Sequence, residues 1–134
     1  MSRGAAWWVY SYIGRRDLAN VYMGSVASAN DRVAQAIEVI QDEWALMAAE
    51  GPTEDEVAKA KALLTGAYPL RFDGNGAIAT IMVSMQMDNM PIDYITTRND
   101  KVDAVTVEDV KRVAGELLTP EKLQFVVVGK PEGL

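Results

Sequence analysis

The sequence offers few side chains that could do chemistry, because it contains no histidine and no cysteine. Without these residues the chain cannot build a Cys/His zinc site, a cysteine nucleophile or a Ser-His-Asp triad. A site made only of carboxylates stays open, since hard cations bind oxygen ligands. The sequence also contains no EF-hand loop, Walker loop or G-x-G-x-x-G motif. Residue types alone therefore reveal no self-sufficient catalytic machinery.

Two short polar runs are candidates for binding a metal or an anion. The acidic run at residues 53–56 (TEDE) has the T-x-x-E spacing of a helix capping box. That spacing favours the start of a helix over a metal site. The run at residues 73–76 (DGNG) is typical of a turn, and it lacks neighbouring groups that would complete a binding loop. We interpret both runs as local structure.

An aromatic segment near the start of the chain is a third candidate. Four of the ten aromatic residues fall within residues 7–12 (WWVYSY). Alternate side chains of a strand share a face, so Trp8, Tyr10 and Tyr12 should lie on one face and Trp7 on the other. Two interpretations stay open. The pattern favours a strand packed in a core, and the alternative is a strand edge or groove that grips a peptide.

A group of methionines is the fourth candidate. Met82, Met85, Met87 and Met90 follow one another at short intervals within an apolar segment. Methionines can form an adaptable binding surface, because the side chain is flexible and polarizable. Residues 77–87 are apolar nearly all round, however, and this predicts a buried helix whose methionines belong to the core.

Both ends of the chain carry strand patterns. Residues 6–13 and 21–28 are rich in β-forming residues, and the polar link 14–20 between them predicts an antiparallel hairpin. Within that link, residues 15–17 (RRD) are most simply a solvated turn. A short apolar strand is expected over residues 123–129 (LQFVVVG).

The middle of the chain has helical periodicity. Apolar residues from Val33 to Met47 recur at intervals of three and four, which places them on one face of a helix. A second helix should start near Glu54, and Pro69 should kink or stop it, since proline lacks an amide donor and clashes with the previous turn. Three further helices are expected over residues 77–87, from residue 89 with Pro91 in the first turn, and from Thr106.

The predicted order of elements is β-β-α-α-α-α-α-β. This order predicts an α+β fold in which helices cover one face of an antiparallel sheet. The length of 134 residues suits a single domain, residues 1–134. Three strands make a small sheet, so we expect one or more further strands to lie upstream of residue 1.

Composition excludes several classes of partner. The net charge of −6 disfavours nucleic acids and anionic membrane surfaces, which need clustered Lys and Arg. No apolar run approaches the roughly 20 residues that span a bilayer, and no signal peptide is visible. The lack of cysteine is compatible with any compartment, so the cytoplasm and the periplasm both stay open.

Four stretches, taken together, resemble the C-terminal, non-zinc half of the pitrilysin/insulinase family of zinc metallopeptidases, which includes bacterial processing-protease relatives. Their order and spacing cover essentially the whole chain and carry the match. They are RGAAWWVYSY (3–12), GSVASANDRVAQAIEVIQDEW (24–44), EGPTEDEVAKAKALLTGAYPLRFDGNGAIA (50–79) and MPIDYITTRNDKVDAVTVEDVKRVAGELLTPEKLQFVVVGKPE (90–132).

The resemblance implies a role beside a zinc site rather than at it. In the family, a first domain carries H-x-x-E-H, in which two histidines bind zinc and the glutamate activates water. A later domain closes over that site with an Arg and a Tyr in a pattern like R-x-x-x-G-x-x-Y, which holds the substrate and stabilises the oxyanion. Aligning RGAAW with the family's RGLAY places Trp7 at the Tyr position. The Arg would fall one residue before Met1, and Met1-Ser2 is then a start or a cloning scar.

From this resemblance we expect a non-catalytic C-terminal domain of a zinc-dependent metalloendopeptidase. Its partners would be a peptide substrate and a catalytic domain or subunit with H-x-x-E-H, and its own residues would bind no metal. Trp7 would be its substrate-binding residue, although an indole N–H donates from a different place than a phenol. The alternatives are a catalytically dead scaffold subunit of a processing-protease-like assembly and a ferredoxin-like interaction domain of accidental similarity.

Overall fold

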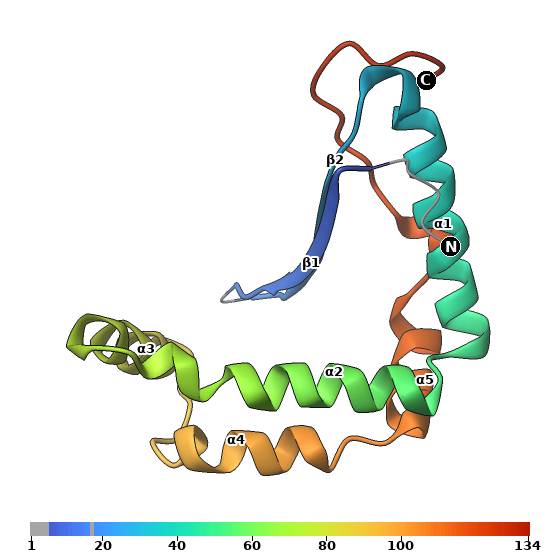
Figure 1. Ribbon diagram of the computed structural model, residues 1–134. Helices are drawn as coiled ribbons and strands as arrows, with labels where there is room; N and C mark the ends of the chain where they lie inside the picture. Colours follow the sequence, from blue (N-terminus) through green and yellow to red (C-terminus); the bar gives the residue numbers. More distant parts are fainter. Residues whose placement is uncertain (1–5, 17) are drawn as a thin grey trace. The chain divides into compact units, whose positions relative to one another are not determined.

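The computed structural model describes residues 6–16 and 18–134, and Figure 1 traces their elements along the chain. These residues form a two-stranded sheet, five α-helices and three short 3₁₀ turns. The predicted α+β class is confirmed. The chain divides into two compact units, one made of residues up to 46 with residues 118–134, and the other of residues 47–117. Arg3 and Gly4 of the matched RGAAW segment, and Asp17 of the expected turn, lie outside the described residues.

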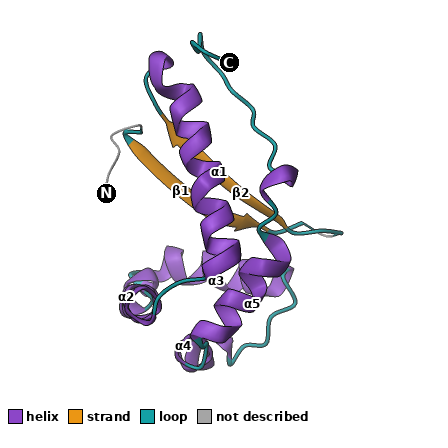
Figure 2. Cartoon of the chain, turned by 90° about the vertical axis from the view of Figure 1, so that its right-hand side faces the viewer, coloured by secondary structure: helices purple, strands orange, loops and turns teal. Residues whose placement is uncertain are grey.

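The first unit contains the predicted hairpin. Strands β1 (Trp8–Gly14) and β2 (Val21–Ala27) pair antiparallel, in a register that runs from Trp8 opposite Ala27 to Gly14 opposite Val21. Figure 2 shows them as the two orange strands. Their bounds agree with the predicted strands to within two residues, because β-branched and aromatic residues suit a pleated strand.

Helix α1 (Val33–Glu50) follows the hairpin after a 3₁₀ turn, Asn30–Arg32. The helix predicted from the apolar spacing between Val33 and Met47 is confirmed. The Trp44 ring on this helix lies against the Tyr22 ring of β2, with centroids 5.4 Å apart and planes tilted by 52°. One face of the sheet is therefore packed against a helix at this point, as the fold prediction required.

The predicted third strand is wrong. Residues 123–129 follow a 3₁₀ turn (Pro120–Lys122) and pair with neither β1 nor β2. Val126 and Val128 remain 92% and 94% exposed. The residues after this segment are held at the 3₁₀ turn before α1, where the Glu132 N–H donates to the Asn30 carbonyl at 3.0 Å. β-propensity describes a fit to a neighbouring strand, so an apolar sequence without such a neighbour stays irregular.

In the second unit, helices α2 (Glu54–Ala67) and α4 (Tyr94–Asp103) lie side by side, as Figure 1 shows in green and orange. Side chains join each helix to the last carbonyls of the other. The Lys61 ammonium donates to the Asp103 carbonyl at 2.8 Å, and the Arg98 guanidinium donates to the Leu64 carbonyl at 2.9 Å. Cations are favourable at helix C-termini, where carbonyls lack intrahelical partners.

The starts of two helices follow the sequence closely. Thr53 and Glu56 form the predicted capping box of α2, and Thr106 with Asp109 makes the equivalent contacts before α5 (Val107–Leu117). Pro69 opens a 3₁₀ turn directly after α2, so it stops that helix as expected.

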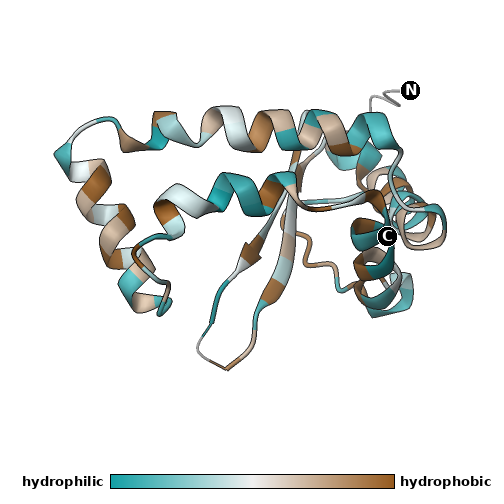
Figure 3. Cartoon of the chain, turned by 90° about the horizontal axis from the view of Figure 1, so that it is seen from below, coloured by the Kyte–Doolittle hydropathy of each residue, from teal (hydrophilic) through white to brown (hydrophobic). Residues whose placement is uncertain are grey.

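Helix α3 (Asn75–Met87) departs from its prediction of full burial. Its residues are mostly hydrophobic, as Figure 3 shows, yet Met85 alone among them is buried. Val83 and Met87 are 55% and 78% exposed. An apolar composition predicts that a helix needs cover, but it cannot say whether the described chain supplies that cover. Helix α4 also starts three residues after Pro91, which lies in the preceding turn.

Each unit has a small core of its own. The buried hydrophobic side chains are Ala36 in the first unit and Val57, Tyr68, Met85 and Ala114 in the second. Within the part of the chain that the structure describes, no helix combines the length and the apolarity that crossing a bilayer requires.

Candidate functional site

Trp7, the predicted substrate-binding residue, has a fixed backbone and an open side chain. It lies in a bend directly before β1, and its N–H donates to the Ala27 carbonyl of β2 at 2.8 Å. The side chain is 78% exposed. The hairpin therefore holds the Trp7 backbone in place while the indole ring stays accessible to another molecule.

Three aromatic rings on β1 form a ladder beside Trp7. The Trp8 and Tyr10 rings stack with centroids 5.2 Å apart, and the Tyr10 and Tyr12 rings stack at 6.0 Å. This confirms that the three side chains share one face, since residues two apart in a strand point the same way. All three remain about half exposed, between 46% and 53%. The favoured expectation of a core strand is therefore wrong for these residues in this structure.

Polar contacts hold the two strands together on both faces of the hairpin. The Tyr12 hydroxyl donates to the Met23 thioether at 3.7 Å, on the face of the aromatic ladder. On the other face, the Tyr22 hydroxyl donates to the Ser11 hydroxyl oxygen at 2.9 Å. Cross-strand pairs of this kind stabilise a sheet locally. They hold the phenol groups of Tyr12 and Tyr22 in defined positions.

The edges of the hairpin can accept another strand. Among the described residues the sheet consists of β1 and β2 alone, so the outer edge of each strand has no ladder partner there. Backbone N–H and C=O groups at such an edge pair readily with an extended peptide, and neighbouring side chains then select its residues. The hairpin thus combines a free edge with aromatic side chains that could contact a bound peptide.

Zinc does not fit the residues that the structure describes. No three histidine, cysteine, aspartate or glutamate side chains gather there as a metal site would require. The acidic run 53–56 is engaged in helix capping instead. Glu56 accepts hydrogen bonds from the Thr53 N–H at 2.8 Å and from its hydroxyl at 2.9 Å. The backbone hydrogen bond from Thr53, followed by that of its hydroxyl, lowers the pKa of Glu56, as expected for a carboxylate that caps a helix.

The turn predicted over residues 73–76 is correct only in part: Asp73 and Gly74 lie before α3, whereas Asn75 and Gly76 are the first two residues of that helix. Gly74 has φ +89° and caps the N-terminus of α3, and the Ile78 N–H donates to its carbonyl at 3.1 Å. A positive φ is easily adopted by glycine, which has no Cβ.

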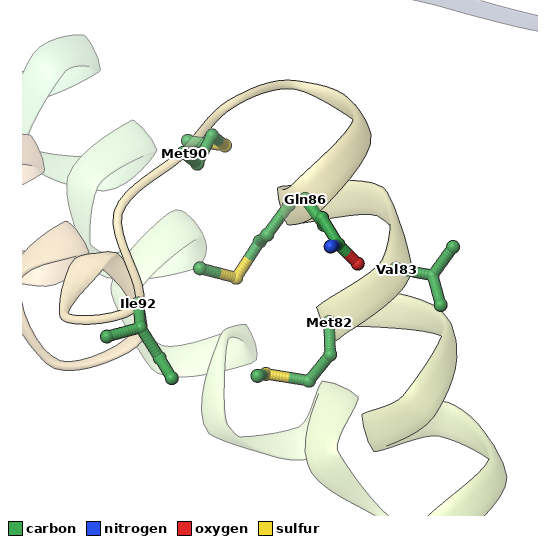
Figure 4. A pocket seen from close by; sticks show the side chains of 6 residues that line it. Met82, Val83, Gln86, Met90 and Ile92 are labelled. Carbon is green, nitrogen blue, oxygen red and sulfur yellow. The ribbon is translucent and has the colours of Figure 1, made fainter.

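The methionines of the fourth candidate line a shallow apolar pocket in the second unit. Its volume is about 270 Å³, and Figure 4 shows side chains from α3 and the segment after it around the opening. The structure brings Met82, Met85 and Met90 together and leaves Met87 outside. Sequence reasoning missed Val83, Gln86 and Ile92, which complete the lining. The spacing of four between Met82 and Gln86 was the available signal, since such residues are neighbours on a helix.

Sequence reasoning also missed the pairing of Tyr22 with Trp44. Both residues lay on predicted elements, but no local pattern links a strand residue to a helix residue 22 positions away. The Trp44 indole N–H is buried and has no hydrogen-bond partner among the described residues.

Comparison with known proteins relates the chain to peptidases. No protein-family model matches it. It is 38% identical over 98 residues to the mitochondrial-processing peptidase subunit beta of Blastocladiella emersonii, an alignment that covers 69% of this chain and 20% of the relative. It is 28% identical over 136 residues to the subunit of the same name from Lentinula edodes, covering 91% of this chain and 29% of the relative.

A bacterial relative gives the same indication. The chain is 31% identical over 122 residues to an uncharacterized zinc protease of Streptomyces coelicolor, which covers 87% of this chain and 25% of the relative. The chain thus spans between a fifth and three tenths of the length of these curated relatives. These similarities support a relationship to pitrilysin-like peptidases, at low identity.

Proposed function

We propose that this chain is a non-catalytic domain of a zinc-dependent metalloendopeptidase of the pitrilysin/insulinase kind. In this proposal, residues 1–134 form one domain that corresponds to the C-terminal, non-zinc half. The domain supplies part of the surface that binds the peptide and closes the chamber around the zinc site. The observation that carries the proposal is the similarity to peptidases over most of a chain that has no histidine.

The zinc and the catalytic groups belong to a partner in this proposal. The family's zinc ligands are the histidines of H-x-x-E-H, and this sequence contains none. A catalytic domain or subunit with that motif would bind the metal and activate the water molecule. What this chain contributes is binding: backbone pairing at a strand edge of the hairpin, and contacts from the exposed Trp7 ring beside it.

A second candidate function rests on one specific departure. Trp7 stands where the family pattern has a tyrosine, so the phenol group that would stabilise an oxyanion is replaced by an indole N–H. This departure favours a scaffold subunit that has lost its part in catalysis and retains only a structural role in a processing-protease-like assembly.

Reconstitution separates these candidates. The purified chain is mixed with the H-x-x-E-H protein of the same organism, and hydrolysis of a quenched fluorescent peptide library is measured with and without it. Zinc content is measured for each component alone. A peptide-binding domain should change KM and kcat and should alter which peptides are cut, whereas a scaffold should change only the stability or the size of the assembly.

Two outcomes contradict both candidates. If the chain alone cleaves peptides or binds stoichiometric zinc, the assignment of these roles to a partner fails. If it neither associates with the H-x-x-E-H protein nor alters its activity, the relationship to peptidases does not extend to a shared assembly.

A further inference from the structure

Helix α3 begins with the one asparagine of this chain that is followed by glycine. The other four asparagines, Asn20, Asn30, Asn89 and Asn99, precede Val, Asp, Met and Asp. The pair Asn75-Gly76 lies at the surface, and Asn75 is the first residue of α3. Asparagine is one of the thermolabile residues, because its side-chain amide can be lost to attack by the backbone. The following residue decides how easily that attack occurs, and glycine obstructs it least.

The local geometry leaves the attacking group accessible. The nucleophile is the backbone nitrogen of Gly76, which lies in the first turn of α3, where N–H groups have no intrahelical carbonyl. The first hydrogen bond of the helix instead joins the Ile78 N–H to the Gly74 carbonyl, at 3.1 Å.

There is also room for the backbone to rearrange. Beyond the adjacent residues and the local helix backbone, a Cβ atom placed on Gly74 or on Gly76 would meet no atom within 4 Å. The preceding residue, Gly74, has φ +89°, so the backbone leaves the helical conformation directly before Asn75.

Asn89 provides a contrast within the same segment. The backbone nitrogen that would attack it belongs to Met90, and that N–H donates to the Met85 carbonyl at 2.8 Å. Asn99 is held differently, because its side-chain amide donates to the Thr65 carbonyl at 3.2 Å. At these two positions a hydrogen bond holds either the nucleophile or the group under attack. The described residues supply neither kind of hydrogen bond at Asn75 and Gly76.

We propose that Asn75 is a site of spontaneous deamidation. The Gly76 nitrogen loses its proton and bonds to the side-chain carbonyl carbon of Asn75, while the bond from that carbon to the amide nitrogen breaks and ammonia leaves. The product is a cyclic imide. Water then adds to one of the two imide carbonyls, and the ring opens to aspartate or isoaspartate.

The two products affect α3 differently. An aspartate at the first helical position adds a negative charge near the N-terminus, where the helix dipole favours it. An isoaspartate adds one carbon to the backbone and displaces the first turn. Because α3 supplies Met82, Val83, Met85 and Gln86 to the apolar pocket, the modification alters the helix that forms this surface.

Peptide mapping tests the proposal on the full chain. The folded protein is incubated in mildly alkaline buffer, and samples are digested with trypsin at successive times. Cleavage after Arg71 and Arg98 yields the peptide 72–98, which contains both Asn75 and Asn89 and so carries its own control. Tandem mass spectrometry locates the exchange of amide for acid, and electron-based fragmentation distinguishes isoaspartate from aspartate.

The expected result is conversion at Asn75 several times faster than at Asn89, with both products formed. The variant Gly76→Ala should slow it several-fold, because the added methyl group hinders the attack while the site has space for it. Equal rates at the two asparagines, or an unchanged rate in Gly76→Ala, would overturn the proposal. So would conversion of Asn75 in urea but not in buffer, since the fold would then protect the site.

Discussion

At the scale of single residues, Trp7 connects the sequence to the proposed function. Its backbone is anchored by a hydrogen bond to Ala27, whereas its ring is 78% exposed and contributes little to the fold. A residue whose backbone is fixed and whose side chain is open is suited to contact a partner or a substrate. The residue can therefore be changed without disturbing the hairpin.

We expect Trp7→Ala to leave the free energy of unfolding within about 0.5 kcal/mol of the parent, because exposed side chains add little to stability. In the reconstituted peptidase, Trp7→Tyr should raise kcat/KM, toward the ~100-fold contribution of a single oxyanion donor. Leu18→Ala, at a fully exposed position of the hairpin link, is the matched control. Unchanged kcat/KM in Trp7→Tyr and in Trp7→Ala would remove Trp7 from the substrate-binding surface.

Gly51, after α1, is a residue whose role is purely structural. Its φ of +72° is a left-handed conformation, and a Cβ there would lie 2.8 Å from the Cβ of Lys111. Gly51→Ala should therefore destabilise the protein by at least about 1 to 2 kcal/mol, the cost of the left-handed region for a residue with a Cβ. Urea unfolding measures the loss. Gly66→Ala is the control, since a Cβ on Gly66 meets nothing within 4 Å. It should be neutral or stabilising by up to about 1 kcal/mol.

At the scale of elements, two helices of the second unit, α2 and α5, begin at side-chain caps. Thr53→Ala removes the hydroxyl that accepts from the Glu56 N–H at 3.3 Å. The expected loss is about 1 kcal/mol, as for other N-caps of this type. Thr80→Ala, which removes only a hydroxyl that donates to the Gly76 carbonyl within α3, should cost much less. Thermal unfolding followed by circular dichroism compares them, and equal effects would mean that the capping box does not stabilise α2.

The same caps make stability depend on pH in a defined direction. Hydrogen bonds from Thr53 lower the pKa of Glu56, and those from Thr106 lower the pKa of Asp109. A carboxyl group whose pKa is lower in the folded state stabilises that state above its unfolded pKa. The contribution is lost as the pH falls through the folded pKa. We therefore expect stability to fall on acidification below the ordinary carboxyl range.

The double variant Glu56→Gln, Asp109→Asn tests this assignment. It should lose part of the acid dependence measured by urea unfolding at several pH values, while other carboxylates retain theirs. An acid dependence identical to that of the parent protein would show that these two caps do not contribute to it.

At the scale of the whole molecule, the described chain exposes surfaces that an assembly would cover. The aromatic ladder of β1, the outward side chains of α3 and the tail at Val126 and Val128 are all open to solvent. The hairpin packs against α1 through Tyr22 and Trp44, and a partner strand would stabilise it further, since two-stranded hairpins are marginally stable alone in water.

Tryptophan fluorescence should report that assembly. Trp7 and Trp8 are 78% and 48% exposed, so their emission should shift to shorter wavelength when the H-x-x-E-H partner covers the hairpin. The variant Trp7→Phe, Trp8→Phe retains only Trp44, on α1, and should show little shift on binding. Binding without a shift in the parent protein would place the interface elsewhere.

How much of the fold and of the candidate site could be predicted depends on how far apart in the sequence the interacting residues lie. The hairpin, the stop at Pro69 and the caps at Thr53 and Thr106 depend on residues within a few positions of one another, and all were predicted correctly. The position of Trp7 relative to the family pattern is likewise a property of the sequence. Whether Trp7 binds substrate stays a prediction.

Only the tertiary structure decided which apolar segments are covered. The sequence of residues 123–129 suits a strand, and that of α3 suits a buried helix. Strand pairing and burial both depend on neighbours that are distant in the chain, and for these segments the described residues do not supply them. The sequence by itself determined the hairpin and the capped starts of α2 and α5, because those limits are set by local hydrogen bonds. The exposure of the aromatic ladder is a property of the tertiary structure, because the burial of a side chain depends on which surfaces meet.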